Sequence, residues 1–354
     1  MDTVIAKIDP SKPDPEMIGR AGEIIRSGGL VAFPTETVYG LGGDALSENS
    51  SRAIYAAKGR PSDNPLIVHI ADLESLGRIV VSVPDAAYAL AEKFWPGPLT
   101  MIMNKSDEVP YATTGGLDTV AVRFPSDPVA QAFIRAAGGY VAAPSANLSG
   151  KPSPTSGKYV VEDMDGRIDM ILYGDDSVIG LESTIVDLTG DSPVILRPGY
   201  ITLEMLKTVL PDVSVDTALL ADDDRTPPKA PGMKYRHYAP KGDLVIVEGG
   251  RDAVISYISE KLSADRSAGK RCGVIASTQT APSYHADVVL DMGDASDHDE
   301  IARRLFGLLR QMDENNVDSI YSEAVSGEGV AAAIMNRLLK AAGHNRIVLG
   351  IDDK

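Results

Sequence analysis

Cysteine is almost absent from this chain of 354 residues, in which Cys272 is the only one. An internal disulfide is therefore impossible, and a metal site built from several cysteines is excluded. The sequence also lacks any run of 18 apolar residues, so we expect no membrane-spanning helix. No basic stretch followed by an apolar one opens the sequence, so we expect a cytoplasmic protein.

Basic residues are in the minority, because 34 Lys and Arg stand against 50 Asp and Glu, for a net charge of −16. The excess is present in the first 210 residues too, with 17 basic and 27 acidic side chains. A protein that binds nucleic acid over a broad surface needs a local excess of Lys and Arg. We therefore do not expect direct tRNA binding, although a small basic pocket for a nucleotide is compatible with this composition.

Several common catalytic and cofactor motifs are also missing. The sequence contains no G-x-x-x-x-G-K-[ST], no G-x-S-x-G and no H-E-x-x-H. Its five histidines never stand at the spacing by which a helix presents metal ligands, so we predict no protein metal site.

Residues 1–210 read as a mixed α/β domain with many short strands and few long helices. A helix is expected from Asp14, a suitable N-cap, to Ser27, before Gly28. Strand-like runs follow at 30–33, 66–70, 99–103, 119–124, 140–143, 171–173, 184–188 and 194–196. Regular helices do not separate these runs, so a simple doubly wound sheet is not expected.

Two further segments complete the predicted organisation. Residues 211–242 are rich in proline, which disfavours helix and central strand, and read as an extended linker. Residues 243–354 alternate strands with helices of ordinary length, which predicts a small parallel, Rossmann-like sheet. The glycine-rich dinucleotide fingerprint is absent there, so a nicotinamide or flavin cofactor is not supported.

Polar residues in the first domain gather where predicted strands end. The run PTETVYGLG (34–42) follows a strand, and its glycines predict a tight turn that can approach a ligand closely. The run KGRPSDNPL (58–66) places two cations in a loop stiffened by prolines, and Arg offers a fork suited to phosphate oxygens. The run SANLSG (145–150) alternates small and hydrogen-bonding side chains.

Arg123 stands near the end of an apolar strand, with Thr119 and Ala121 expected on its own face and Val120 and Val122 on the other. A buried arginine needs an anion, which a ligand carboxylate or a structural acid would supply. His69, on another apolar strand, is compatible with a plain core position. Together these motifs predict a site for a nucleotide and a small polar molecule, with catalysis by positioning and charge.

The motifs resemble those of one family. The runs KGRPSDNPL with VHI, PTETVYGLG, SANLSG, and STIVD with LRPG are similar to the YrdC-like domain of threonylcarbamoyl-AMP synthases over residues 14–210. The cluster KYRHYAP and the C-terminal segment resemble the longer, two-domain form. The resemblance implies a twisted, mixed α/β sheet with a cationic concave cavity. It also implies synthesis of L-threonylcarbamoyladenylate and pyrophosphate from L-threonine, bicarbonate or CO2, and ATP, with Mg²⁺ held mainly by the phosphates.

The resemblance also implies roles for particular residues. Those expected around L-threonine are Thr37, His69, Arg123, Ala143 and Ser183. Those expected around ATP are Arg60, Asn64, Thr119, Ser145, Ser153 and Arg197, with Tyr235 or Tyr238 of the linker as a lid. Lys58 and Arg60 are expected to act in catalysis through the phosphates. The product would pass to the machinery that makes N6-threonylcarbamoyladenosine at position 37 of tRNA.

Two other interpretations are weighed against this one. An RNA-binding module of the same fold is disfavoured by the acidic first domain. A carbamoyl-transfer enzyme of a maturation pathway carries zinc-finger-like segments, which a single cysteine cannot provide.

Overall fold

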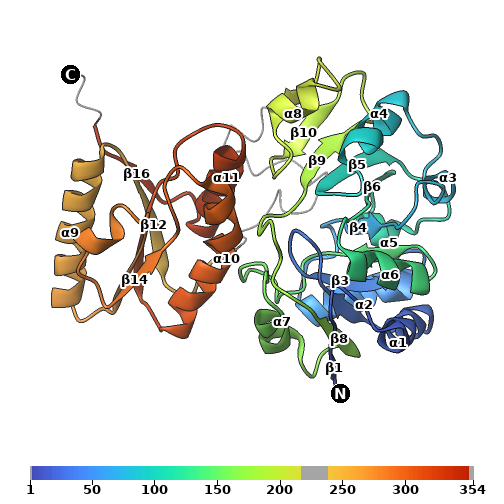
Figure 1. Cartoon of the computed structure of the whole chain (residues 1–354), viewed down its shortest axis with the longest axis horizontal. Coiled ribbons are helices and arrows are strands. Elements are labelled where there is room, and N and C mark those ends of the chain that lie inside the picture. Colours follow the sequence, from blue (N-terminus) through green and yellow to red (C-terminus); the bar gives the residue numbers. More distant parts are fainter. Residues whose placement is uncertain (1, 217–237, 351–354) are drawn as a thin grey trace. The chain divides into compact units, whose positions relative to one another are not determined.

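The computed structural model of this protein describes residues 2–216 and 238–350, which form two compact units (Figure 1). The described part of the first unit comprises residues 2–149 and 153–216, and that of the second comprises 150–152 and 238–350. The predicted linker 211–242 falls largely on residues 217–237, which lie outside the described part. The boundaries at 210 and 242 therefore remain predictions.

The first unit is built on a mixed sheet in which eleven strands of the described chain pair in the order β1-β8-β2-β3-β7-β4-β6-β5-β9-β10-β11. Its strands are β1 (Val4–Lys7), β2 (Val31–Phe33), β3 (Gly40–Asp44), β4 (Ile67–His69), β5 (Leu99–Asn104), β6 (Thr119–Arg123), β7 (Val141–Ala143), β8 (Met170–Tyr173), β9 (Thr184–Asp187), β10 (Val194–Arg197) and β11 (Ser214–Val215). Its helices are α1 (Pro15–Arg26), α2 (Glu48–Lys58), α3 (Leu76–Ile79), α4 (Asp85–Phe94), α5 (Tyr111–Thr114), α6 (Pro128–Ala136), α7 (Gly157–Met164) and α8 (Leu203–Lys207).

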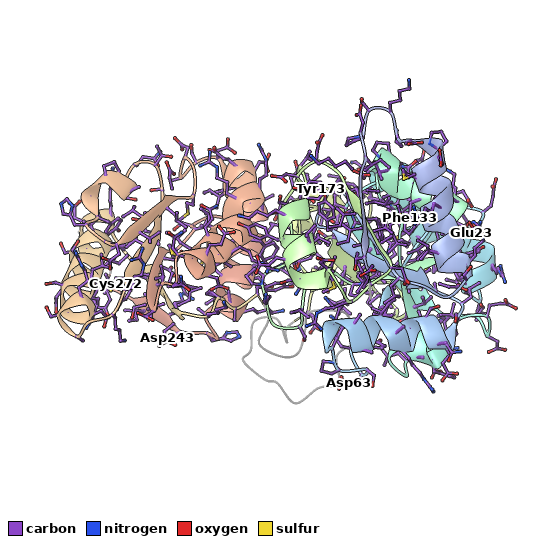
Figure 2. All side chains as sticks on the ribbon, turned by 90° about the horizontal axis from the view of Figure 1, so that it is seen from below. Glu23, Asp63, Phe133, Tyr173, Asp243 and Cys272 are labelled. Atoms are coloured by element: carbon purple, nitrogen blue, oxygen red, sulfur yellow. The ribbon has the colours of Figure 1, made fainter. Side chains whose placement is uncertain are left out.

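Helix α1 shows how local sequence sets these elements. Asp14 is its N-cap and accepts a hydrogen bond from the backbone N–H of Glu16 at 2.9 Å, as the sequence predicts. Gly28 follows the helix with a φ of 87°, a conformation that glycine adopts without strain. The buried face of α1 packs on α6, and both helices cover an apolar cluster that includes Phe33 and Phe133 (Figure 2 labels Phe133).

The glycines of the PTETVYGLG run form strand β3 and not the tight turn that the sequence predicts. Gly40 pairs with Phe33 of β2, and a Cβ at Gly40 would lie 2.9 Å from the ring atom Cζ of that phenylalanine. A Cβ at Gly42 would lie 2.8 Å from a methyl group of Val141. Glycine is therefore required here because neighbouring side chains occupy the space of a Cβ.

The face of the sheet that bears Arg123 carries the polar residues of interest. Val120 and Val122 point into the main core of the unit on the opposite face. Ala121 belongs to a separate apolar cluster, on the same face as Arg123. Cross-strand pairing places His69 of β4, Arg123 of β6 and Thr100 of β5 side by side, because each is the register partner of the next. The alternation predicted for this strand is thus confirmed.

The second unit has an all-parallel sheet of five strands in the described chain, in the order β14-β13-β15-β12-β16. Its elements are β12 (Asp243–Glu248), α9 (Arg251–Ser267), β13 (Cys272–Ala276), the 3-10 turn η2 (Ala281–Ser283), β14 (Val288–Asp291), α10 (His298–Glu314), β15 (Ser319–Glu323), α11 (Val330–Ala341) and β16 (Arg346–Val348). Helix α9 covers one face of this sheet and α10 and α11 cover the other (Figure 1). The predicted Rossmann-like layering of this segment is confirmed.

Candidate active site

Arg123 and Thr37 meet on the polar face of the first unit. Both side chains are buried, and the Arg123 guanidinium donates a hydrogen bond from Nη1 to Thr37 Oγ1 at 2.8 Å. Arg123 Nη2 also lies 2.8 Å from Oε1 of Glu36. The anion that the sequence requires for this arginine is therefore present as an acid of the PTETVYGLG run, beside the threonine that the sequence identifies.

The loop that carries these residues is held in one shape by its own hydroxyls and by distant backbone. Thr35 Oγ1 donates to the carbonyl of Val38 at 2.6 Å and lies 3.0 Å from Thr37 Oγ1. The carbonyl of Glu36 accepts a hydrogen bond from Ile179 N at 2.9 Å. Such local side-chain to backbone bonds fix a loop without secondary structure, so the Thr37 hydroxyl is held in place before any ligand arrives.

His69 lies beside Arg123 and is uncharged. Burial, with the positive charge of Arg123 adding, lowers the pKa of His69 to about 3. Its Nδ1 is 3.1 Å from the carbonyl of Ile67, a contact that ties the ring to the backbone of its own strand. The ring meets Phe33 edge to face at a centroid distance of 6.1 Å. His69 therefore offers a fixed, neutral ring and not a cation.

Ser183 joins two further strands to this row. Its hydroxyl is 2.7 Å from the Thr100 hydroxyl, and its carbonyl accepts a hydrogen bond from Arg197 Nη2 at 2.9 Å. Gly199 explains the close approach of the LRPG run, because a Cβ there would lie 2.5 Å from Thr184 N. Ala143, on β7, is the register partner of Ile67. It therefore lies on the face of the sheet that also bears His69, two residues after Ile67.

Lys58 is at the end of helix α2 and not in the loop that the sequence predicts, and only 2% of its surface is exposed. Its ammonium group donates to the carbonyls of Ser145 and Asn147 and to Asn147 Oδ1 at 3.3 Å. Ser145 in turn pairs with Gly40 through an isolated β-bridge. Lys58 thus ties the SANLSG run to α2, next to the glycine strand.

Arg60 and Asn64 form a second group. Arg60 Nη2 donates to the carbonyls of Asn64 and Pro65 at 3.4 and 3.3 Å. The Asn64 side chain is fully buried, and neither its Oδ1 nor its Nδ2 has a hydrogen-bond partner among the described residues. A buried amide without partners is costly, which is typical of a group that serves a ligand.

The remaining predicted residues are more scattered. Ser153 donates a hydrogen bond to Glu182 Oε1 at 2.8 Å, and Glu182 is the residue directly before Ser183. Thr119 begins β6, four residues before Arg123, and so lies roughly 13 Å from it along the strand. Tyr238 belongs to the second unit, where its buried ring lies 5.1 Å from that of Phe306. Tyr235 lies outside the described residues.

Sequence reasoning missed three residues of this arrangement. Glu36 is inside the run that was singled out, and its position between two threonines that contact the site is the signal that could have identified it. Glu182 directly precedes Ser183 and offered a similar signal. Thr100 carried none, because its contact with Ser183 depends on β5 and β9 being neighbours.

The described residues contain no group of three or more His, Cys, Asp or Glu that could hold a metal ion. No helix within the described ranges is long and apolar enough to span a membrane. The donor groups of the polar face are instead hydroxyls, amides and guanidinium groups, which suit carboxylate and phosphate oxygens.

Comparison with known proteins finds relatives over nearly the whole chain. The Sua5/YciO/YrdC family model, described as telomere recombination, matches residues 23–199, and the model described as threonylcarbamoyl-AMP synthase, C-terminal domain, matches residues 201–343. A threonylcarbamoyl-AMP synthase of Pyrococcus abyssi is 50% identical over 92% of this chain and 94% of its own length. One of Bacillus subtilis is 46% identical over 94% of both chains.

A solved structure also matches nearly the whole chain. The crystal structure of P. abyssi Sua5 complexed with L-threonine has a TM-score of 0.93 and 48% sequence identity, and the match covers 98% of this chain and 100% of that one. The chain therefore belongs to the threonylcarbamoyl-AMP synthase family, in the form that joins a YrdC-like domain to a Sua5 C-terminal domain.

Proposed function

We propose that this protein is a nucleotidyltransferase that makes L-threonylcarbamoyladenylate and pyrophosphate from L-threonine, bicarbonate or CO2, and ATP. The observation that carries the proposal is the buried row of hydroxyl and guanidinium groups across neighbouring strands, from Thr37 and Arg123 to Thr100, Ser183 and Arg197. Such a row can fix an amino acid and stabilise phosphate charge without a nucleophilic residue. We propose that this face is the floor of a cationic substrate cavity.

L-Threonine is proposed to bind at Thr37, His69, Arg123, Ala143 and Ser183. The Arg123 guanidinium suits the substrate carboxylate, because a planar fork binds two oxygens at once. The hydroxyl of Ser183 suits the side-chain hydroxyl of threonine. The small Ala143 leaves room for the threonine methyl group, which is worth about 1–3 kcal/mol against serine.

ATP is proposed to bind at Arg60, Asn64, Thr119, Ser145, Ser153 and Arg197, with Tyr235 or Tyr238 as the lid. The unpartnered amide of Asn64 supports its place in this set. Lys58 and Arg60 are proposed to act in catalysis by stabilising negative charge on the phosphates. Mg²⁺ is proposed to enter with ATP, held mainly by phosphate oxygens, since the described residues contain no cluster of three or more His, Cys, Asp or Glu.

The chemistry proceeds in two bond-forming steps. The ammonium group of threonine first loses one proton to water, and the neutral amine then attacks the carbon of CO2 as one C–O π bond breaks. Loss of a second proton from nitrogen to water leaves the carbamate. A carbamate oxygen then attacks the α-phosphorus of ATP, and the bond from this phosphorus to the bridging oxygen of pyrophosphate breaks. The charge that develops on phosphate oxygens is what the guanidinium groups stabilise.

The product is a mixed anhydride, and its consumer must be a group-transfer enzyme. We propose the tRNA threonylcarbamoyl transferase machinery, which modifies adenosine 37, as that partner. We propose that the enzyme works in the cytoplasm, where ATP and tRNA are both available.

The test is pyrophosphate release by the purified full-length protein, with L-threonine and bicarbonate omitted in turn. Release should require ATP and both co-substrates. Release at the full rate without threonine and without bicarbonate would contradict the proposal.

A further inference from the structure

Glu36 is a buried acid to which the chemistry above gives no role. Its side chain is 6% exposed and that of Arg123 is 5% exposed, and Oε1 lies 2.8 Å from Arg123 Nη2. Despite this short distance, neither oxygen of Glu36 accepts a hydrogen bond within the described part of the chain. A buried carboxyl group with unused lone pairs is costly, so its position calls for a hydrogen-bond donor.

Arg123 shows the complementary feature. Its Nη1 is engaged by Thr37, whereas its Nε and Nη2 have no hydrogen-bond partner in residues 2–216 and 238–350. These two nitrogens form one edge of the guanidinium, and this edge is the one that can donate two parallel hydrogen bonds to a carboxylate. The two groups therefore form a close ion pair in which neither satisfies the other's hydrogen-bonding capacity.

The two groups are also held in place. The Glu36 carbonyl accepts from Ile179 N at 2.9 Å, and the neighbouring hydroxyls of Thr35 and Thr37 lie 3.0 Å apart. Arg123 is fixed on a central strand, between His69 and Thr100. Two different segments thus hold the carboxylate and the guanidinium edge at a fixed separation.

An α-amino acid carries a carboxylate and an ammonium group on one carbon atom. We propose that Glu36 is the positioning residue that binds the substrate ammonium group while the Nε–Nη2 edge of Arg123 binds the substrate carboxylate. This inference rests on the proposed function and adds the recognition of the amine. The amine is the atom that must meet CO2, so holding it decides where the carbamate forms.

The experiment compares binding of L-threonine with binding of 2,3-dihydroxybutanoate, in which a hydroxyl replaces the ammonium group. Isothermal titration calorimetry with the full-length protein and ATP gives both affinities. The wild-type protein should prefer L-threonine by about tenfold or more, the size of a charge-assisted hydrogen bond. The Glu36→Gln variant should bind the two compounds within about threefold of each other, with binding of ATP alone unchanged.

Two variants guard against a purely structural effect. Glu36→Asp keeps the charge and should keep most of the preference for L-threonine. Asp127→Asn removes another acid, whose charge interacts with that of Glu36. This variant should keep the full preference for L-threonine. A folded Glu36→Gln protein that still prefers L-threonine by about tenfold would overturn the inference, as would equal weakening of both compounds. Failure of the proposed function appears separately, as pyrophosphate release by the wild-type protein without threonine.

Discussion

Arg197 is anchored on Ser183 through both the backbone and the side chain of that residue. Its Nε and Nη2 donate to the Ser183 carbonyl at 3.1 and 2.9 Å, and Nη2 also reaches the Ser183 hydroxyl at 3.1 Å. The same hydroxyl lies 2.7 Å from that of Thr100. Ser183, proposed for threonine, therefore contacts both a guanidinium proposed for ATP and the hydroxyl of Thr100.

The Ser183→Ala change separates these two roles. It keeps the carbonyl that accepts two hydrogen bonds from Arg197, and it removes the hydroxyl that faces Thr100 and accepts a third. We expect the KM for L-threonine to rise about tenfold, the effect of one buried hydrogen bond, and the KM for ATP to change by less than about twofold. Steady-state pyrophosphate release measures both constants.

The matched control is Thr100→Ser, which keeps the hydroxyl next to Ser183 and should leave both constants nearly unchanged. An equal rise in both constants for Ser183→Ala would show that the serine supports the two substrates as one structural unit.

Lys58→Met tests the buried ammonium group. The variant keeps a long side chain but removes the donor from the carbonyls of Ser145 and Asn147. Because buried acceptors are left without a partner, we expect the free energy of unfolding to fall by about 2–4 kcal/mol. We also expect kcat to fall about 100-fold, the effect of losing one group that stabilises charge.

Urea denaturation and pyrophosphate release measure these two quantities on the same preparation. A stable variant with full kcat would contradict both the structural and the catalytic role of Lys58.

The Asp127→Asn change tests the charge balance around Arg123. Burial, with the negative charge of Glu36 adding, raises the pKa of Asp127 from 3.8 to about 6. A raised pKa means that the neutral carboxyl stabilises the folded protein below about pH 4, and that this contribution is lost as the pH rises through 6. The asparagine variant, whose amide does not titrate, should therefore gain about 1–2 kcal/mol relative to wild type between pH 4 and pH 7.

Paired urea titrations across this pH range give the difference. His69 is present in both proteins, so its own pH dependence cancels in the subtraction. A constant difference from pH 4 to pH 7 would show that Asp127 keeps an ordinary pKa.

Gly22→Ala tests the contact between α1 and α6. A Cβ at Gly22 would lie 2.5 Å from the backbone carbon of Ala136, which cannot move aside as a flexible side chain can. We expect the free energy of unfolding to fall by about 1–3 kcal/mol, although alanine is the better helix former. Gly19, on the same helix, has no atom within 4 Å of a Cβ. Gly19→Ala should therefore raise the free energy of unfolding by up to about 1 kcal/mol. In urea denaturation, the midpoints of the two variants should shift in opposite directions from that of the wild type.

Much of the fold could be predicted because local periodicity decides it. The second unit alternates apolar strands with helices as the sequence predicts, and one of these helices covers His298–Glu314. Its last strand, Arg346–Val348, was not predicted, since three residues with exposed ends carry almost no pattern. The turn predicted at Gly40–Gly42 was wrong because the packing of Phe33 and Val141, which only the folded chain reveals, is what requires glycine there.

The site, too, could be predicted only in part from the sequence. Its motifs could be identified from hydroxyls, cations and glycines at predicted strand ends. The pairings could not, since Thr37 meets Arg123 and Ser183 meets Thr100 only through the order of strands in the sheet. Strand order depends on long-range contacts that a single sequence does not show.

The central claim is that this protein joins threonine to the AMP part of ATP through one carbon atom taken from bicarbonate, with release of pyrophosphate. The most direct measurement is mass spectrometry of the adenylate formed with ¹³C-labelled bicarbonate, together with the amount of pyrophosphate released. We predict a threonylcarbamoyl adenylate that carries one ¹³C atom and forms in equal amount to pyrophosphate. An adenylate of threonine without the labelled carbon would contradict the account.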